Sequence, residues 1–176
     1  AGFREAYHHY VEQGWNAISG PEEFGGQGLP FSLATCVMET LGAANLGFTL
    51  LPILAVGAIE AIAHHGSEAQ KALYLPKLVS GEWSGTMNLT EPQAGSDVGA
   101  LRTTATPITA DDFGGEHAGK WTIRGTKIFI TFGEHDLTSN IVHLVLARTP
   151  GAPEGSRGIS LFIVPKLLVA PDGTLG

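Results

Sequence analysis

Apolar residues recur at helical spacing in the first half of the chain. Leu33, Val37 and Leu41 are four residues apart, which places them on one face of a helix. Gly42 and Gly47 then weaken this helix toward its end, because glycine is a poor helix former. We therefore predict that the first long helix fades within this stretch.

A second and a third helix are predicted beyond it. Residues 53–64 form an apolar segment, and Gly66 stands where a helix C-cap would lie. Ser67 and Gln70 then have the spacing of a capping box, in which each side chain satisfies a free backbone N–H group of the other residue. The third helix is expected over residues 68–78, and helical character ends near residue 81.

After residue 83 the pattern changes to short β-branched and apolar runs separated by turn residues, which is typical of strands. We expect the pair Arg124-Gly125 to join two of these strands as a hairpin. No helix-length pattern separates them, so the sheet should be mostly antiparallel. The prediction is an α+β chain with a helical part at 1–82 and a β-barrel or sandwich part at 83–176. The six candidate strands are 84–89, 101–108, 121–124, 127–131, 141–148 and 158–164.

Composition places the chain among folded domains with a partly covered surface. It has 176 residues, of which 43% are apolar and only 15% are charged. A typical soluble domain has about 25% charged residues, so part of this surface should be covered by a partner or by more of the same protein. The net charge of −7 and the lack of a basic run argue against a nucleic-acid partner.

The cysteine content and the lack of targeting patterns bear on the cellular location of the protein. One cysteine, Cys36, cannot form an internal disulfide, which fits a reducing compartment, and its apolar helical context predicts a buried side chain. We find no signal-peptide pattern and no run of about 18 apolar residues, so we expect a cytoplasmic protein with no membrane partner. Both ends look cut, which suggests a piece of a longer protein.

Two patterns that resemble functional motifs are set aside. Residues 114–120 (GGEHAGK) nearly fit a phosphate-binding P-loop, but Trp121 replaces the Ser or Thr, and a strand pattern follows instead of a helix. A hairpin tip is the alternative. The seven histidines include two adjacent pairs but lack metal-ligand spacing, so we expect no metal site.

The segment 87–105 contains several residues that could bind a ligand. Pro92 fixes its own φ and favours an extended Glu91, which opens a turn after a strand. Gly95 permits unusual backbone conformations and close approach of a ligand, with Ser96 and Asp97 beside it. Exposed N–H groups at such a turn bind anions. A phosphate-bearing ligand and an ordinary β-connection are both consistent with these residues.

A second segment, 120–133, ends in an aromatic residue and a hydroxyl. Phe129 and Thr131 are two residues apart and would share one strand face, which suits a flat heteroaromatic ring. The alternative is a core Phe129 and a solvent-facing Thr131.

Together these segments resemble the acyl-CoA dehydrogenases. TEPQAGSD at 90–97 is similar to that family's signature T-E-P-x-A-G-S-D, and GTKIFITFG at 125–133 to its G-x-K-x-[WFY]-I-T-x-G. Two further blocks, PEEFGGQG at 21–28 and GSEAQKALYLPKLVSG at 66–81, resemble segments of the family's N-terminal helical domain. The four blocks stand in the family's order and span most of the chain.

The resemblance implies a helical domain, a middle β domain and a C-terminal four-helix bundle, of which this chain would hold part of the first and most of the second. It also implies bound FAD. Thr90 would bond the pyrimidine side of the flavin, Phe129 would cover a ring face where Trp is common, and Thr131 would lie near N5. Ser96 would touch both the pyrophosphate and the acyl-CoA. The full set of implied FAD contacts is Met87, Leu89, Thr90, Gly95, Ser96, Phe129, Ile130 and Thr131.

The implied reaction is α,β-dehydrogenation of an acyl-CoA within fatty-acid β-oxidation, with electrons passed to an electron-transfer flavoprotein. The family's base is a Glu beyond the middle domain. No residue of this chain takes that role, and Glu91 belongs to the signature turn. The resemblance also implies a homodimer or homotetramer as the assembly of the full-length protein. Residues 133–140 (GEHDLTSN) resemble a bacterial subgroup that includes enzymes acting on 3-methylthiopropanoyl-CoA. An oxidase, a monooxygenase-like relative and a non-catalytic flavin- or CoA-binding module remain the alternatives.

Overall fold

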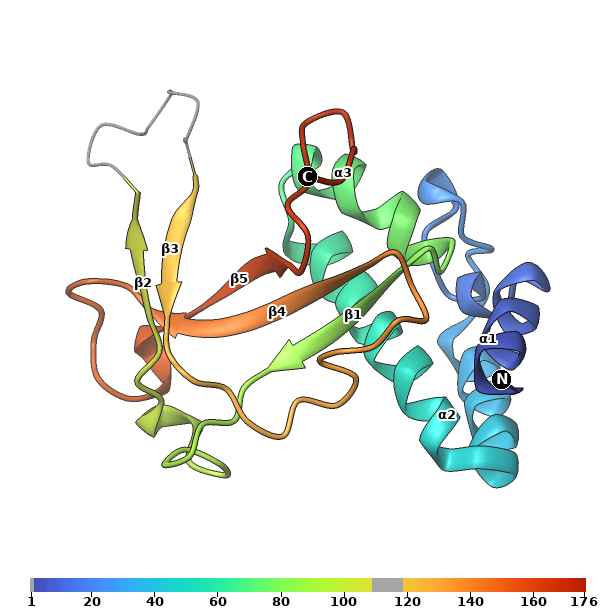
Figure 1. Ribbon diagram of the computed structural model, residues 1–176, viewed down its shortest axis with the longest axis horizontal. Helices are drawn as coiled ribbons and strands as arrows, with labels where there is room; N and C mark the ends of the chain where they lie inside the picture. The colour runs from blue at the N-terminus through green and yellow to red at the C-terminus, as the bar shows by residue number, and fades with distance from the viewer. Residues whose placement is uncertain (1, 109–118) are drawn as a thin grey trace. The chain divides into compact units, whose positions relative to one another are not determined.

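A computed structural model describes residues 2–108 and 119–176 of the chain (Figure 1). It divides into two compact units, each built from several segments. Unit 1 holds Ala1–Met87, Thr131–His143 and Val164–Gly176, and unit 2 holds Asn88–Ile130 and Leu144–Ile163. Strands β4 (Asn140–Arg148) and β5 (Ile159–Pro165) contribute residues to both units.

Unit 1 contains the helical part of the chain. The predicted helical segments lie in α2 (Phe31–His65) and α3 (Glu68–Val79). Helix α1 (Gly2–Glu12) and the short 3-10 turns at Trp15–Ala17 and Glu22–Phe24 were not predicted as separate elements. The capping box is confirmed at the start of α3: Gln70 N–H donates to Ser67 Oγ at 3.3 Å, and Ser67 N–H donates to Gln70 Oε1 at 2.8 Å. Gly66 is the C-cap of α2, in an extended conformation.

The first and second predicted helices are joined in α2. Asn45 has φ −158° and ψ 98°, which is not helical, and its Oδ1 accepts a hydrogen bond from Phe48 N–H at 3.0 Å. Asn45 therefore caps the N-terminus of a new helical segment, as Asn side chains often do. The break falls between the two glycines that weaken the first segment.

Helix α2 also supplies the core of unit 1. Tyr7 and Tyr10 of α1 pack with Phe48 and Leu51 of α2 in a buried aromatic and aliphatic cluster. By length and composition α2 would pass as a membrane span, but 50% of its most apolar window is already buried inside the protein. Core helices of soluble proteins pass the same test, so this is weak evidence for a membrane.

Strand β1 (Trp83–Asn88) follows α3 and packs closely on α2. A Cβ at Gly85 would come within 2.3 Å of the Ala58 Cβ, so only glycine permits this approach. Ser84 and Thr86, on either side, are fully buried. The glycine thereby fixes β1 against the helix.

The strand order is β1-β4-β2-β3, and β5 also pairs with β4 (Figure 1). In unit 2, β2 (Thr104–Pro107) and β3 (Trp121–Arg124) are antiparallel, with Thr104 opposite Arg124. β2 and β4 are parallel, with Thr104 opposite Arg148, so the sheet is more mixed than the expected antiparallel arrangement. The long connection between β2 and β4 makes this parallel pairing possible.

Two strand predictions fail. Residues 127–131 are not a strand, so Arg124-Gly125 does not join two strands as a hairpin: the antiparallel partner of β3 is β2. The predicted strand at 101–108 shortens to β2. The remaining four candidates match β1, β3, β4 and β5 to within one residue at each end.

Candidate functional site

The signature segment of unit 2 begins with a closed turn. Glu91 and Ala94 exchange two backbone hydrogen bonds, each 3.0 Å long, so Pro92 and Gln93 form the tip. This is the turn that Pro92 predicts. It leaves Gly95 and Ser96 on the exposed side of the segment.

The Glu91 carboxylate organises the residues around this turn. It is 4% exposed and accepts hydrogen bonds from the backbone N–H groups of Arg102 at 2.7 Å and Thr103 at 3.0 Å. The Gln93 amide donates at 2.7 Å and the Lys127 ammonium at 2.8 Å. Burial alone would raise the pKa of Glu91, but the hydrogen bonds from Lys127, Thr103 and Arg102 hold it down to about 2. Glu91 is thus an ionised structural carboxylate, which agrees with excluding it as the catalytic base.

Lys127 joins the second motif to the first. Its ammonium also donates to the Leu89 carbonyl at 3.0 Å, and Ile128 N–H donates to the Thr90 carbonyl at 2.9 Å. Residues 127 and 128 therefore lie beside residues 89–91, although 36 positions separate the bonded side chains. Sequence patterns alone give Lys127 no role, because its partner is distant along the chain.

The segment after Lys127 turns outward. Phe129 has φ +57°, a left-handed conformation that is rare for a bulky residue, and is 88% exposed. The proposal that Phe129 and Thr131 share a strand face is wrong, since no strand forms there. Phe129 is also not a core residue. A large aromatic ring held out in a strained turn is a feature of functional sites.

Some of the expected FAD contacts lie side by side in unit 2, and others belong to unit 1. In unit 2, Leu89 and Thr90 are tied to the 127–128 segment next to Phe129 and Ile130. Met87 at the end of β1 and Thr131 belong to unit 1, where Thr131 is exposed.

The segment 95–97 retains the features of an anion site. Within residues 2–108 and 119–176, no acceptor is bonded to the N–H groups of Gly95 and Ser96. Gly95 does not adopt the positive φ that its type permits, which corrects that expectation; a Cβ there would meet nothing within 4 Å. Free N–H groups next to the Ser96 hydroxyl fit a phosphate or pyrophosphate group.

Arg148 supports the chain that follows this segment. Its guanidinium donates to the carbonyls of Gly99, of Leu101 at 3.0 Å, of Pro153 at 3.0 Å and of Gly155 at 2.9 Å. One cation thus holds residues 99–101 against the 153–155 loop. The sequence signal is an arginine at the end of a mostly apolar strand, which by itself does not reveal its partners.

Three further candidates from the sequence are Cys36, the histidines and the P-loop-like stretch. Cys36 is exposed rather than buried, because the face of α2 that bears it is not covered by the described residues. No group of three or more His, Cys, Asp or Glu side chains in the described chain is placed to hold a metal. The P-loop-like stretch lies mainly in 109–118, outside the described residues, and β3 follows it.

Comparison with known proteins agrees with these motifs. Residues 2–82 match the acyl-CoA dehydrogenase N-terminal domain, and residues 86–173 match the acyl-CoA dehydrogenase middle domain. A 3-methylmercaptopropionyl-CoA dehydrogenase from Ruegeria pomeroyi is 56% identical over 98% of this chain and 28% of its own length. This chain thus spans less than a third of that relative.

Two solved structures share the fold. An acyl-CoA dehydrogenase from Bacillus anthracis, complexed with FAD, has a TM-score of 0.76 and 30% identity over 93% of this chain and 25% of its own. A chain in a structure of the electron transferring flavoprotein of Acidaminococcus fermentans has a TM-score of 0.76 and 32% identity, over 93% of this chain and 40% of its own. With both domain matches, the chain belongs to the acyl-CoA dehydrogenase family.

Proposed function

We propose that the full-length protein is an FAD-dependent acyl-CoA dehydrogenase. The observation that carries this proposal is the way Glu91 and Lys127 join the two motifs and leave Phe129 exposed. An exposed aromatic face suits a flavin ring, and the free N–H groups of Gly95 and Ser96 suit the pyrophosphate. FAD in the related Bacillus anthracis structure supports the same assignment.

The FAD-holding residues divide by the part of the cofactor they would contact. Met87, Leu89, Thr90, Ile130 and Thr131 would line the flavin, with the Thr90 and Thr131 hydroxyls as hydrogen-bonding groups. Phe129 would cover a ring face. Bound FAD would supply the electron acceptor for the hydride that leaves the β-carbon of the substrate. The chain's own part is to bind and orient the ring and to keep one face of it covered.

The substrate would be a saturated acyl-CoA thioester with a short acyl group. The 56% identity to the Ruegeria enzyme supports 3-methylthiopropanoyl-CoA or a thioester of similar length. The exposed Ser96 hydroxyl is available to the CoA moiety. The α-proton would pass to a carboxylate base outside this chain, since the Glu91 carboxylate already accepts four hydrogen bonds.

Reduced enzyme would pass its electrons to an electron-transfer flavoprotein, as part of fatty-acid β-oxidation in the cytoplasm. A homodimer or homotetramer is the expected assembly of the full-length protein. The likeness to a chain in the Acidaminococcus structure supports this electron partner. Oxidation by oxygen instead would identify an acyl-CoA oxidase.

Anaerobic titration of the full-length protein tests the proposal. Purified holoenzyme is mixed with 3-methylthiopropanoyl-CoA, butyryl-CoA, octanoyl-CoA and palmitoyl-CoA, and the visible flavin absorbance is followed. We expect bleaching by the two short thioesters and little by palmitoyl-CoA. Reoxidation is then compared between oxygen and an electron-transfer flavoprotein. Bound flavin that no thioester bleaches would overturn the dehydrogenase assignment.

A further inference from the structure

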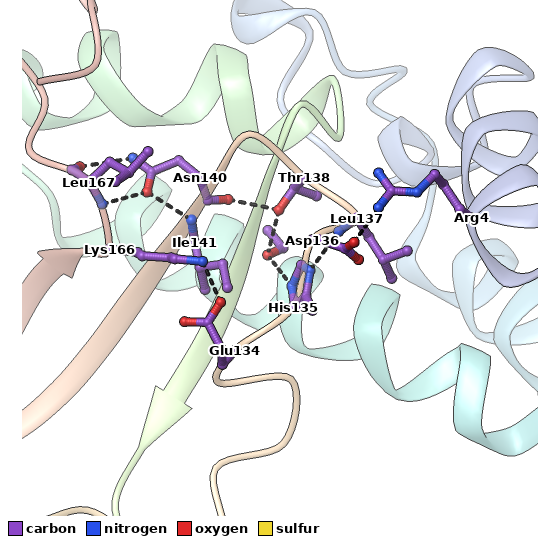
Figure 2. A network of polar contacts seen from close by, with 11 residues as sticks. Arg4, Glu134, His135, Asp136, Leu137, Thr138, Asn140, Ile141, Lys166 and Leu167 are labelled. Carbon is purple, nitrogen blue, oxygen red and sulfur yellow. Dashed lines mark hydrogen bonds and ion pairs between the residues drawn. The ribbon is translucent and has the colours of Figure 1, made fainter. Parts of the chain in front are cut away.

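The segment from Thr131 to the start of β4 is held by a dense polar network within unit 1 (Figure 2). Arg4 of α1 pairs with Asp136, and Lys166 pairs with Glu134. The Asn140 side chain exchanges two hydrogen bonds with the backbone of Leu167, at 3.0 and 2.9 Å. At the centre lies His135, which is hydrogen-bonded to Ser84 of the buried strand β1.

The direction of each hydrogen bond around His135 follows from the groups at the two ends. The Asn140 carbonyl only accepts, so Thr138 donates its hydroxyl proton to it at 2.8 Å. Thr138 must then accept from the Ser84 hydroxyl at 3.2 Å. Ser84 in turn must accept from His135 Nε2–H at 3.0 Å.

The hydrogen bond at the other ring nitrogen, Nδ1, indicates the same protonation state of His135 independently. Leu137 N–H donates to His135 Nδ1 at 3.1 Å, so Nδ1 carries no proton. Both ends therefore assign one state to His135: a neutral imidazole with its proton on Nε2. The bond from residue 137 back to residue 135 has the spacing of an Asx-turn, with the imidazole in the place of an Asn side chain.

This chain of bonds links two elements that carry proposed flavin contacts. Ser84 lies three residues before Met87 on β1, and His135 lies four residues after Thr131. Ser84 is fully buried, and its strand is fixed against α2 at Gly85. A loop bonded to Ser84 therefore takes its position from β1.

We propose that His135 is a positioning residue that, through Ser84 and Thr138, sets the placement of the flavin-facing Thr131 relative to Met87. The inference rests on the proposed function. It requires neutral His135, because a proton on Nδ1 would face the Leu137 N–H and break the turn. Loss of that turn would release the segment that begins at Thr131.

The charges around His135 favour the neutral ring. Burial lowers the pKa of His135 from its ordinary value of 6.5, and the nearby Lys166 and His143 lower it further, while Glu134 and Asp136 oppose them. Each of these two acids is paired with a cation, Lys166 or Arg4. The bonded form of the loop is thus retained at pH 7, and because the pKa of His135 is lowered, it is lost only at a pH below the ordinary range of histidine.

Three single variants and one double variant of the full-length holoenzyme test the proposal. His135→Asn keeps an acceptor for Leu137 N–H but lacks the donor to Ser84, and Ser84→Ala removes the next hydroxyl. Each should slow flavin reduction by the thioester about tenfold, the effect of one lost hydrogen bond that orients the reacting groups. The double variant should lose no more than either single one. His135→Gln, which can still reach Ser84, should recover part of the rate.

A pH profile separates positioning from a merely structural role. The wild-type rate of flavin reduction should fall on the acid side as His135 gains its proton, and this step should be missing in His135→Asn. His64→Asn, at the exposed end of α2, is the matched control and should behave as wild type. FAD content, the visible spectrum and the thermal unfolding temperature are measured for each variant.

The outcomes distinguish the two proposals. A wild-type protein without flavin, or one that no thioester reduces, would overturn the proposed function first. A wild type that reacts normally while His135→Asn and Ser84→Ala keep its rate within twofold would overturn the positioning role alone. Additive losses in the double variant would do the same, because independent effects cannot run through one chain of bonds. If His135→Asn fails to fold, Ser84→Ala and Thr138→Val decide by the same criteria.

Discussion

Glu91 carries the strongest local constraint at the scale of single residues. Its buried carboxylate joins the signature turn, the backbone at residues 102–103 and Lys127. The Lys127 side chain is only 9% exposed, so both charges of the pair are largely shielded from water. Breaking such a pair from one side is costly, because the remaining charge stays buried.

We therefore predict that Glu91→Gln lowers the free energy of unfolding by about 3–5 kcal/mol. The substitution keeps the shape of the side chain but leaves the Lys127 ammonium without an anion. Urea unfolding of the purified protein measures the loss. The matched control is Glu154→Gln, an exposed carboxylate of the same unit, which should change stability by less than about 0.5 kcal/mol. A loss below about 1 kcal/mol for Glu91→Gln would show that Lys127 readily finds other partners.

The same carboxylate gives stability a defined pH dependence. The native pKa of Glu91 is about 2, below its ordinary 4.5, so the unfolded state binds more protons between these values. The contribution of Glu91, about 3 kcal/mol, is present above pH 4.5 and lost as the pH falls toward 2. The difference between wild type and Glu91→Gln should shrink over that interval. A constant difference would contradict the assigned ionisation.

At the scale of elements, α2 depends on a cap inside its length. Asn45 leaves the helical conformation and accepts the Phe48 N–H, which starts the segment that carries Leu51 into the core. We expect Asn45→Ala to destabilise the protein by about 1 kcal/mol, and Asn45→Asp or Asn45→Ser to retain most of the stability. Thermal unfolding measures the effect. Thr35→Ala, at an exposed position of the same helix, is the control. Equal stability of Asn45→Ala and wild type would mean that packing alone fixes the break.

Elements with local determinants were predictable from the sequence. The Ser67–Gln70 capping box involves residues three apart, and the structure contains both of its hydrogen bonds. Strand β3 was predicted with its observed bounds, and β4 to within one residue, because their apolar and β-branched runs are bounded by turn residues. Local chemistry was sufficient in each of these cases.

Residues 127–131 show where local reasoning fails. Their composition favours a strand, but Lys127 is bonded to Glu91 and Phe129 adopts a positive φ. Contacts between residues far apart in sequence override strand propensity here. The exposure of Cys36 has a similar cause, since helical periodicity defines a face but not what covers it. The role of His135 likewise could not be predicted from the sequence, because its partner Ser84 lies 51 positions away.

At the scale of the whole molecule, the low fraction of charged residues is accompanied by exposed apolar side chains. Large apolar side chains are exposed in unit 1, among them Phe31 at 62%, Leu46 at 63% and Leu168 at 76%. Single exposed apolar residues are ordinary, but these accompany a chain with only 15% charged residues. The chain spans 28% of the Ruegeria relative, so that relative has further residues that could cover the corresponding surface in its own structure.

The 176-residue chain alone is expected to be inactive as a dehydrogenase. Purified as 176 residues and supplied with FAD, it should not be bleached by the thioesters that reduce the full-length holoenzyme. The reason is chemical: removal of the α-proton needs a free carboxylate of suitable pKa, and the carboxylate of the signature turn is already bonded and has a pKa of about 2. FAD binding, followed by quenching of flavin fluorescence, is measured in parallel so that loss of cofactor is not mistaken for loss of the base. Bleaching of a flavin bound to the isolated chain would place the base within these residues and overturn its assignment to another part of the protein.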